Sequence, residues 1–359
     1  LLIASEQKYE VDKTISSFYI ITSICEIFVL FFFKSYIVYL IIEMVCIIFQ
    51  QYIIYKKALN RFPYIMHNNV RLNKKEKKEL WKNVYGLSIN KFAGAILSSI
   101  DNIVISTFIS TKIVGIYSNY TMILAAATGI ISMAFTSITA NIGRKFADKS
   151  IKEEHFYIMF YINFLVCGIC TILYYLLIND FIVIFYGKNL ILGNDAIFAI
   201  TFNMFITHMM QAIQVFKEAS GIFWYGKYRP LFTCILNVFF SLILVKSYGI
   251  AGVVFATALS RIFTTVWFDP YLVFRHAFNK NTKKYWIKYF YYVFVIVISL
   301  IVTHFTIELL GIYSETIAGF VLKSTVSILL CPIVMILGTI WLKESKNIFS
   351  MVIKRINIH

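Results

Sequence analysis

Apolar stretches long enough to cross a lipid bilayer recur along nearly the whole chain. A membrane-spanning helix needs about 20 consecutive, mainly apolar residues. Of the 359 residues, 59% are hydrophobic and only 14% are charged, whereas soluble domains carry about 25% charged residues. We therefore expect ten spanning segments, at residues 14–33, 35–55, 84–109, 114–138, 157–178, 196–216, 230–246, 250–272, 288–306 and 317–341.

These segments are expected to be helices, because lipid offers no hydrogen-bond partner and a helix satisfies its own backbone polar groups. Strands of a membrane barrel are about ten residues long and alternate strictly between apolar and polar residues. The sequence does not show that alternation. The expected fold class is all-α, a polytopic membrane helix bundle with about ten transmembrane helices present.

Positive charge gathers on one side of this predicted topology. When successive loops are assigned to alternate sides, 27 of the 34 Lys and Arg residues share the side of residues 1–13, and four lie on the other. Loops rich in Lys and Arg stay in the cytoplasm, so the C-terminus is expected there as well. The net charge of +16 is thus explained without nucleic acid, which we do not expect as a partner.

The longest basic loop, residues 57–83, contains the segment RLNKKEKKELWKN at 71–83. Its composition predicts a short amphipathic helix that lies on the inner membrane surface and is held by anionic lipid. A docking site for a cytoplasmic enzyme is the alternative interpretation. Membrane lipids are therefore expected partners of the chain.

Polar residues inside the predicted spans are the candidates for function, because charge is costly in lipid. A rotation of about 100° per residue places Asn90, Lys91, Asp101 and Asn102 on one half of the segment 84–109. That half needs water or polar protein beside it, which predicts a polar cavity. Lys91 could instead extend to the membrane surface, and this alternative stays open.

Arg261 lies in the middle of its predicted span and needs an acidic partner or an anionic ligand. Asp269 lies two turns further along and about 80° around the helix, a poor position for a pair. An acid on another helix and a bound anion both remain possible partners. Glu26 and Glu43 are central in their own spans, and either could pair with a cation or carry a coupling proton.

Several short motifs do not indicate enzymatic chemistry. Gly221–Tyr228 has the GxxxxGK spacing of a phosphate-binding loop, but it lacks the following Ser or Thr and a preceding strand. Cys167 and Cys170 have CxxC spacing within an apolar segment, where small apolar residues of a helix are the simpler interpretation. We expect no metal site, no cofactor and no catalytic residue, so the chain is not predicted to be an enzyme.

The chain begins at Leu1, without the charged segment and cleavage site of a signal peptide. We expect that an N-terminal part of the protein precedes this residue. The chain would then be a C-terminal portion of a longer membrane protein.

Four segments, in order along the chain, resemble a known family. The first, Leu1–Glu10 (LLIASEQKYE), is similar to the loop before the fifth helix of polysaccharide repeat-unit flippases, also called Wzx-type, of the MOP exporter superfamily. The segments Asn90–Tyr120, Glu218–Pro230 and Gly249–Phe274 resemble further parts of the same family. The resemblance rests on the order of these four segments, which covers nearly the whole chain.

The resemblance implies about fourteen helices, in two six-helix lobes that face a central cavity and two additional helices. Residues 1–56 would then hold the last two helices of the N-terminal lobe, 57–83 a cytoplasmic basic loop, 84–274 the C-terminal lobe, and 275–359 two extra helices and a basic tail. The implied activity is transfer of an undecaprenyl-diphosphate-linked oligosaccharide to the outer leaflet of the bacterial plasma membrane by alternating access. The product would be capsule, O-antigen or a similar polymer, with a polymerase and a chain-length regulator as implied partners.

Cavities of this family are typically cationic, which the resemblance carries over to Lys91 and Arg261. The complete set of predicted substrate contacts is Asn90, Lys91, Asn102, Asn119 and Arg261, with Asp101, Glu26 and Glu43 as candidates for ion coupling or charge pairing.

Two other functions could use the same residues. A cation-coupled multidrug or small-molecule exporter of the same superfamily would depend on Glu26, Glu43 and Asp101. A membrane-embedded glycan polymerase usually carries its chemistry on a large outer loop. The longest predicted outer loop here, residues 179–195, is short, which disfavours an enzyme of that kind.

Overall fold

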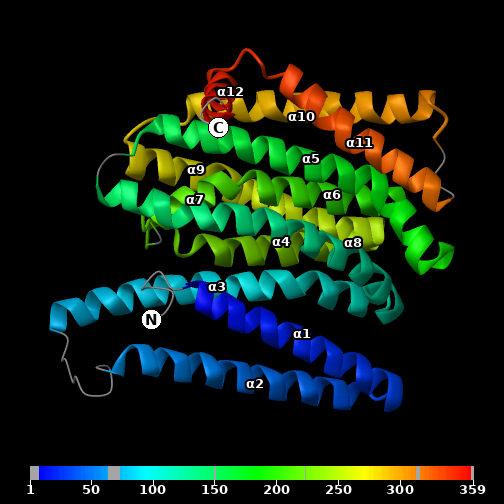
Figure 1. Cartoon of the computed structure of the whole chain (residues 1–359), viewed down its shortest axis with the longest axis horizontal. Helices are drawn as coiled ribbons and strands as arrows, with labels where there is room; N and C mark the ends of the chain where they lie inside the picture. Colours follow the sequence, from blue (N-terminus) through cyan, green and yellow to red (C-terminus); the bar gives the residue numbers. More distant parts are fainter. Residues whose placement is uncertain (1–7, 64–72, 149–150, 223, 313–315, 357–359) are drawn as a thin grey trace. The chain divides into compact units, whose positions relative to one another are not determined.

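The computed structural model of the protein describes residues 8–63, 73–148, 151–222, 224–312 and 316–356, and no strand occurs among them. The predicted all-α class is confirmed (Figure 1). The α-helices are α1 (Lys8–Phe32), α2 (Tyr36–Arg61), α3 (Lys74–Phe108), α4 (Thr111–Ala147), α5 (Glu153–Tyr186), α6 (Asn194–Met209), α7 (Gln211–Ala219), α8 (Arg229–Arg261), α9 (Trp267–Val273), α10 (Lys283–Leu309), α11 (Ile317–Leu337) and α12 (Lys343–Ile356).

Seven helical segments of the described chain are long and apolar enough to cross a membrane: Tyr9–Phe32, Tyr36–Arg61, Glu153–Tyr186, Asn194–Ala219, Arg229–Phe278, Lys283–Leu309 and Ile317–Leu337. The fifth of these covers two of the predicted spans, 230–246 and 250–272. Helices α3 and α4 occupy the predicted spans 84–109 and 114–138 but are not among the seven. The chain is therefore a polytopic helical membrane protein.

The chain divides into two compact units, Leu1–Lys77 and Lys78–His359. In the first unit α1 and α2 form a helical hairpin, in which Lys57 donates a hydrogen bond to Thr14 (2.8 Å) and lies 3.8 Å from Glu10. Most large apolar side chains of both helices are exposed. Exposed apolar side chains suit a lipid environment, because lipid tails are as apolar as a protein interior.

The basic segment predicted as a separate surface helix is helical from Lys74 onward, but it continues without interruption into α3. Asn73 accounts for the start of this helix, because its side chain accepts from the Lys74 amide (2.7 Å) while its own amide donates to Glu76 (2.9 Å). This arrangement is similar to a capping box. No proline follows to break the helix, so residues 74–83 of the predicted loop belong to the same helix as the span after them. Residues 64–72 lie outside the described part of the chain.

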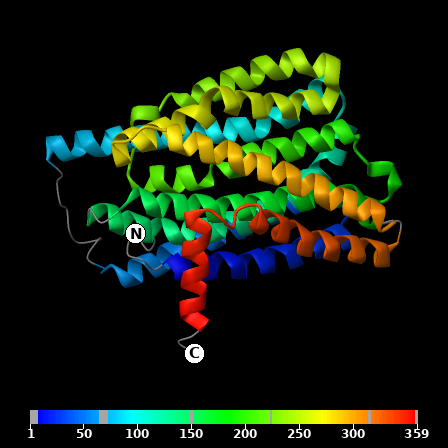
Figure 2. The same cartoon turned by 90° about the horizontal axis from the view of Figure 1, so that it is seen from above.

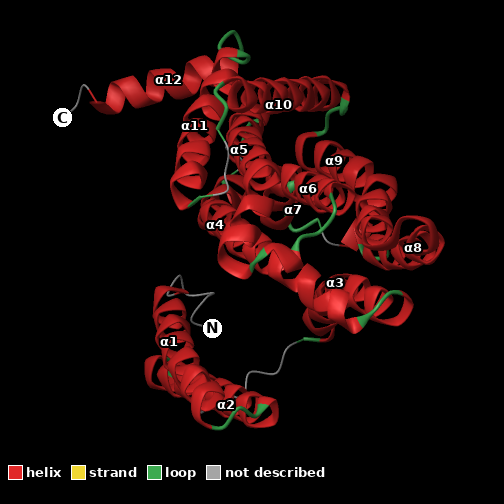
Figure 3. Cartoon of the chain, turned by 90° about the vertical axis from the view of Figure 1, so that its right-hand side faces the viewer, coloured by secondary structure: helices red, strands yellow, loops and turns green. Residues whose placement is uncertain are grey.

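In the second unit α5 is the central helix and packs against α4, α6, α7, α10, α11 and α12 (Figure 3). Phe156, Phe160 and Phe164 repeat at four-residue intervals on α5 and are fully buried. Phe156 alone lies within 6.1 Å, between ring centroids, of six other aromatic rings. The interior of this unit is thus an aromatic cluster assembled on one helix.

Helix α8 is a hairpin of two antiparallel legs rather than one rod. At Gly249 the backbone has φ 55° and ψ −130°, which interrupts the helix and suits a residue without a β-carbon. Polar bonds join the two legs: Thr233 to Thr264 (2.8 Å) and Asn237 to Thr257 (2.6 Å). The break lies between the predicted spans 230–246 and 250–272, as the sequence indicated.

The tight turn of this hairpin gives a first prediction, for Gly252→Ala. A β-carbon at Gly252 would lie 2.3 Å from the backbone oxygen of Leu244, and a backbone atom cannot move aside easily. Overpacking of this kind costs about 1–3 kcal/mol, which should appear as a lower Tm in detergent. Gly115→Ala is the matched control, because a β-carbon added at Gly115 would meet nothing within 4 Å. A Tm for Gly252→Ala at or above that of Gly115→Ala would contradict the prediction.

The last helix, α12, runs across the direction of the long helices (Figure 2). Glu344, in its first turn, accepts a hydrogen bond from Lys288 of α10 (2.8 Å). Just before α12, Thr339 hydrogen-bonds to Tyr161 of α5 (2.9 Å). These buried polar contacts fix the chain where it leaves the last candidate span.

Candidate functional site

A cavity of about 270 Å³ lies inside the second unit, between α3, α6, α7, both legs of α8 and the π-helical turn Ile262–Val266. Among the described residues that line it, two are arginines and none is acidic. The lining residues are Ala93, Gly94, Leu97, Ile206, Thr207, Met210, Gln211, Gln214, Arg229, Pro230, Thr233, Arg261, Thr265 and Val266. A cavity with these groups can bind an anion, because its wall presents charged donors and no carboxylate.

Arg261 ends the second leg of α8, and the π-helical turn follows directly. Pro270 accounts for an irregular helix here, because proline has no amide hydrogen to donate and crowds the carbonyl of Val266, four residues earlier. The Nη1 of Arg261 is 3.4 Å from the side-chain oxygen of Asn203 on α6. Asp101 and His208 also lie within range of electrostatic interaction with this guanidinium. Arg261 therefore faces the cavity with only partial neutralisation.

Arg229 begins α8 and belongs to a buried charge cluster that also contains Lys217, Gln214 and Asp269. Asp269 Oδ1 accepts from Lys217 (2.9 Å) and lies 3.2 Å from Arg229 Nε, while Oδ2 accepts from Gln214 (2.9 Å). The Lys217 and Asp269 side chains are 5% and 0% exposed. One buried carboxylate thus faces a buried cation, Lys217, and a partly buried one, Arg229.

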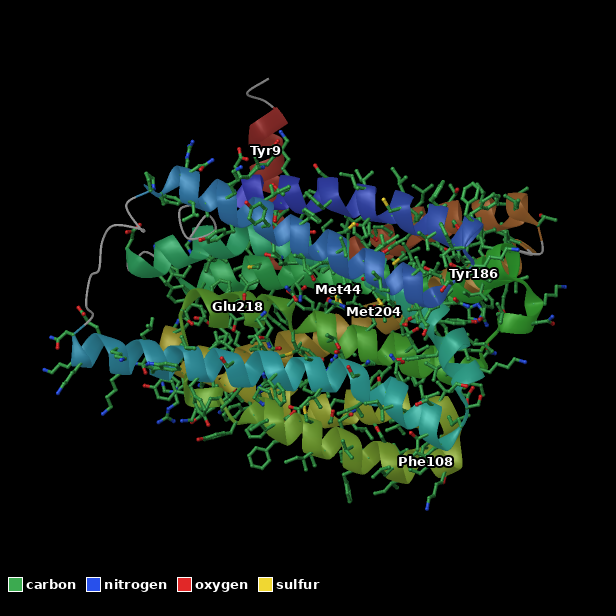
Figure 4. All side chains as sticks on the ribbon, turned by 90° about the horizontal axis from the view of Figure 1, so that it is seen from below. Tyr9, Met44, Phe108, Tyr186, Met204 and Glu218 are labelled. Carbon is green, nitrogen blue, oxygen red and sulfur yellow. The ribbon has the colours of Figure 1, made fainter. Side chains whose placement is uncertain are left out.

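The charge cluster marks one end of the second unit. Figure 4 shows Glu218, the neighbour of Lys217 near the end of α7, toward the end of the bundle opposite Phe108 and Tyr186, where α3 and α5 end. By the charge asymmetry of the loops, the Glu218 end is the one predicted to face the cytoplasm.

Asp101 is buried on α3 and is held by a chain of hydrogen bonds from α8. Asn237 donates to Thr257 (2.6 Å), and Thr257 donates to Asp101 (2.8 Å). Tyr117 on α4 also lies within range of electrostatic interaction with this carboxylate. The structure therefore brings Asp101 and Arg261, two predicted residues, to neighbouring positions.

The other predicted cavity residues are placed differently. Lys91 and Asn102 are exposed on α3, Asn119 is half-buried on α4, and none of the three lines the cavity. The side chain of Asn90 lies outside the described part of the structure.

Glu26 and Glu43 belong to the first unit and are half-buried on α1 and α2. Tyr39 of α2 lies within electrostatic range of both carboxylates.

The sequence interpretation missed Arg229, Lys217 and Gln214. Arg229 and Lys217 were counted with the loops, because each stands at the end of an apolar stretch where basic residues normally face the cytoplasm. Asp269, an acid inside an apolar segment, was the available signal. Such a residue requires cations nearby, and Lys217 and Arg229 are close to the ends of the neighbouring spans.

No protein-family model, no curated protein and no solved structure matches this chain. The class of the protein is therefore inferred from its helices and its cavity. It is a multi-span helical membrane protein with a cavity in the helix bundle that two arginines line, and this arrangement is consistent with a transporter.

Proposed function

We propose that the protein exports a lipid-linked, diphosphate-bearing oligosaccharide across the bacterial plasma membrane during surface polysaccharide synthesis. The observation that carries the proposal is the pair Arg229 and Arg261 on the wall of a cavity without acidic lining residues. Arginine binds phosphate oxygens through paired, charge-assisted hydrogen bonds. The resemblance of four segments to polysaccharide repeat-unit flippases favours this class of substrate.

The cavity contains donors for both parts of such a headgroup. Arg229 and Arg261 would bind the diphosphate, while Thr207, Gln211 and Gln214 offer hydroxyl and amide groups to the first sugar. At about 270 Å³ the chamber takes the diphosphate and adjoining atoms rather than a whole oligosaccharide. The proposal assigns transport and not catalysis to the chain, and it places the C-terminus in the cytoplasm by the asymmetry of Lys and Arg.

The test replaces both arginines in the chromosomal gene. We expect Arg229→Ala combined with Arg261→Ala to lower surface polysaccharide at least tenfold at normal protein level, because both charged donors to the phosphates are lost. Arg275→Ala is the matched control, since Arg275 is exposed and bonds Tyr271 rather than the cavity. The readout is polysaccharide on intact cells, with the protein level measured by immunoblot.

Lys91→Ala tests whether Arg229 or Lys91 is the cation that binds the diphosphate together with Arg261. If Arg229 is that cation, Lys91→Ala should retain surface polysaccharide, as Arg275→Ala does. Normal surface polysaccharide in the double arginine variant would contradict the proposed site.

A cation-coupled small-molecule exporter is the second candidate, and the buried Asp101 favours it. A carboxylate held by Thr257 near Arg261 could exchange a proton or a metal cation during transport. Asp101→Asn would then abolish drug resistance conferred by the protein while surface polysaccharide stays normal. Glycosyltransferase genes beside this gene would favour the first candidate, and an isolated gene the second.

A further inference from the structure

A groove of about 410 Å³, distinct from the cavity, opens on the surface of the α8 hairpin. Aromatic side chains make up most of it, and four of them, Tyr225, Phe232, Phe263 and Trp267, are more than half exposed. The lining residues are Tyr225, Gly226, Tyr228, Arg229, Phe232, Leu236, Phe263, Thr264, Trp267 and Phe268.

The position of the groove suits the boundary between acyl chains and headgroups. Phe232, Phe263 and Trp267 belong to the candidate span Arg229–Phe278, whereas Tyr225 and Tyr228 come just before it. Tyrosine and tryptophan side chains favour that boundary, because one end of each ring is apolar and the other forms hydrogen bonds. The indole of Trp267 bonds the Phe263 carbonyl (2.7 Å), which fixes one wall of the groove.

Arg229 is the charged group of the groove, and it also lines the cavity. Its buried carboxylate partner, Asp269, is shared with the buried Lys217, so these three groups together carry a net positive charge. Glu218 lies next to Lys217 but is exposed, where solvent weakens its effect. The groove therefore combines an apolar surface with an incompletely neutralised cation at one end.

We propose that this groove binds an anionic phospholipid of the membrane, with an acyl chain along Phe232, Phe263 and Trp267 and the phosphate at Arg229. Phospholipid is the occupant that mass action favours, because the membrane itself supplies it in large excess over any transported lipid. Basic pockets between spanning helices are a recurrent form of lipid headgroup site. The inference goes beyond the proposed export function and does not depend on it.

Trp267 allows the site to be tested in the intact chain. The other four tryptophans, Trp81, Trp224, Trp286 and Trp341, are replaced by Phe, and the protein is placed in phosphatidylcholine nanodiscs with increasing brominated phosphatidylglycerol. Quenching of Trp267 should reach half its maximum at about a tenfold lower mole fraction than with brominated phosphatidylcholine, the ratio expected of one charge-assisted contact. Arg229→Gln should remove this preference and Arg229→Lys should retain most of it.

A second pair of variants tests the apolar wall independently of the charge. Phe232→Ala should weaken phosphatidylglycerol binding several-fold, whereas Phe239→Ala should not. The two residues lie on the same leg of α8 and are 61% and 57% exposed, but only Phe232 lines the groove. This pair keeps the proposal testable even if Arg229→Gln does not fold.

Three results would overturn the inference. The first is equal quenching of Trp267 by the two brominated lipids, and the second is equal binding by Phe232→Ala and Phe239→Ala. The third is a competition result, in which unbrominated polyprenyl phosphate displaces brominated phosphatidylglycerol at a lower mole fraction than unbrominated phosphatidylglycerol does. That third result would assign the groove to the chain of a transported lipid and would leave the export proposal intact.

Discussion

Asp269→Asn is expected to lower the free energy of unfolding by about 3–5 kcal/mol, the usual cost of removing one partner from a buried ion pair. The carboxylate is fully buried and accepts from Lys217 and Gln214 while it faces Arg229. Asparagine retains the shape but leaves two buried cations without a counter-charge. Unfolding by SDS in mixed micelles measures the change.

A second substitution should recover part of that loss. Lys217→Met in the Asp269→Asn background removes one of the two unpaired cations and places an apolar chain in the same space, so we expect at least half of the lost stability to return. Glu308→Gln is the control for removal of a carboxylate, since Glu308 is 65% exposed, and exposed pairs contribute about 0–1 kcal/mol. If Asp269→Asn lowered the free energy of unfolding no more than Glu308→Gln does, the charge cluster could not be buried in the folded protein.

The positions of the helices were predictable because the bilayer imposes them. Each predicted span falls on a helix, and even the narrow interval between 246 and 250 contains Gly249, where α8 turns back. Apolar length and backbone hydrogen bonding decide such features locally. The basic segment at the start of α3 shows the limit of this reasoning, because the helix predicted there as a separate surface element is continuous with the span that follows it.

The candidate site was predictable only in part, because helical periodicity tells which residues share a face but not which face is buried. In α3 the buried side contains Ala93, Ile100 and Ile105 together with Asp101, while Lys91 is exposed. Contacts with α8 that are remote in sequence determine that choice, such as the bonds from Thr257 to Asp101 and from Cys234 to the Ala93 carbonyl. Arg261 could be identified as a site residue from the sequence alone, since a cation in the middle of an apolar span requires a polar environment.

Phe156→Ala should cost about 3 kcal/mol of unfolding free energy, at the low end of the 3–5 kcal/mol range for truncating a buried aromatic residue. The low end applies because lipid, rather than water, surrounds these helices, so the loss comes from the cavity and the missing ring contacts more than from hydration. Phe156 is fully buried and contacts Phe216, Phe274 and Tyr285, from three other elements. Its removal should therefore loosen α7, the π-helical turn Phe274–Phe278 and α10 together.

Phe294→Ala provides the matched comparison, because Phe294 lies on α10 with 61% of its surface exposed. If that surface faces acyl chains, lipid fills the space left by the ring, and the cost should stay within about 0.5 kcal/mol, as at ordinary surface positions. A difference of about 2 kcal/mol or more between the two variants, by SDS unfolding in mixed micelles, would follow from close packing inside the bundle and fluid lipid outside it. Equal losses would mean that the α5 aromatic cluster is no better packed than the lipid-facing surface, and the rigid interior on which the position of the cavity arginines depends would be absent.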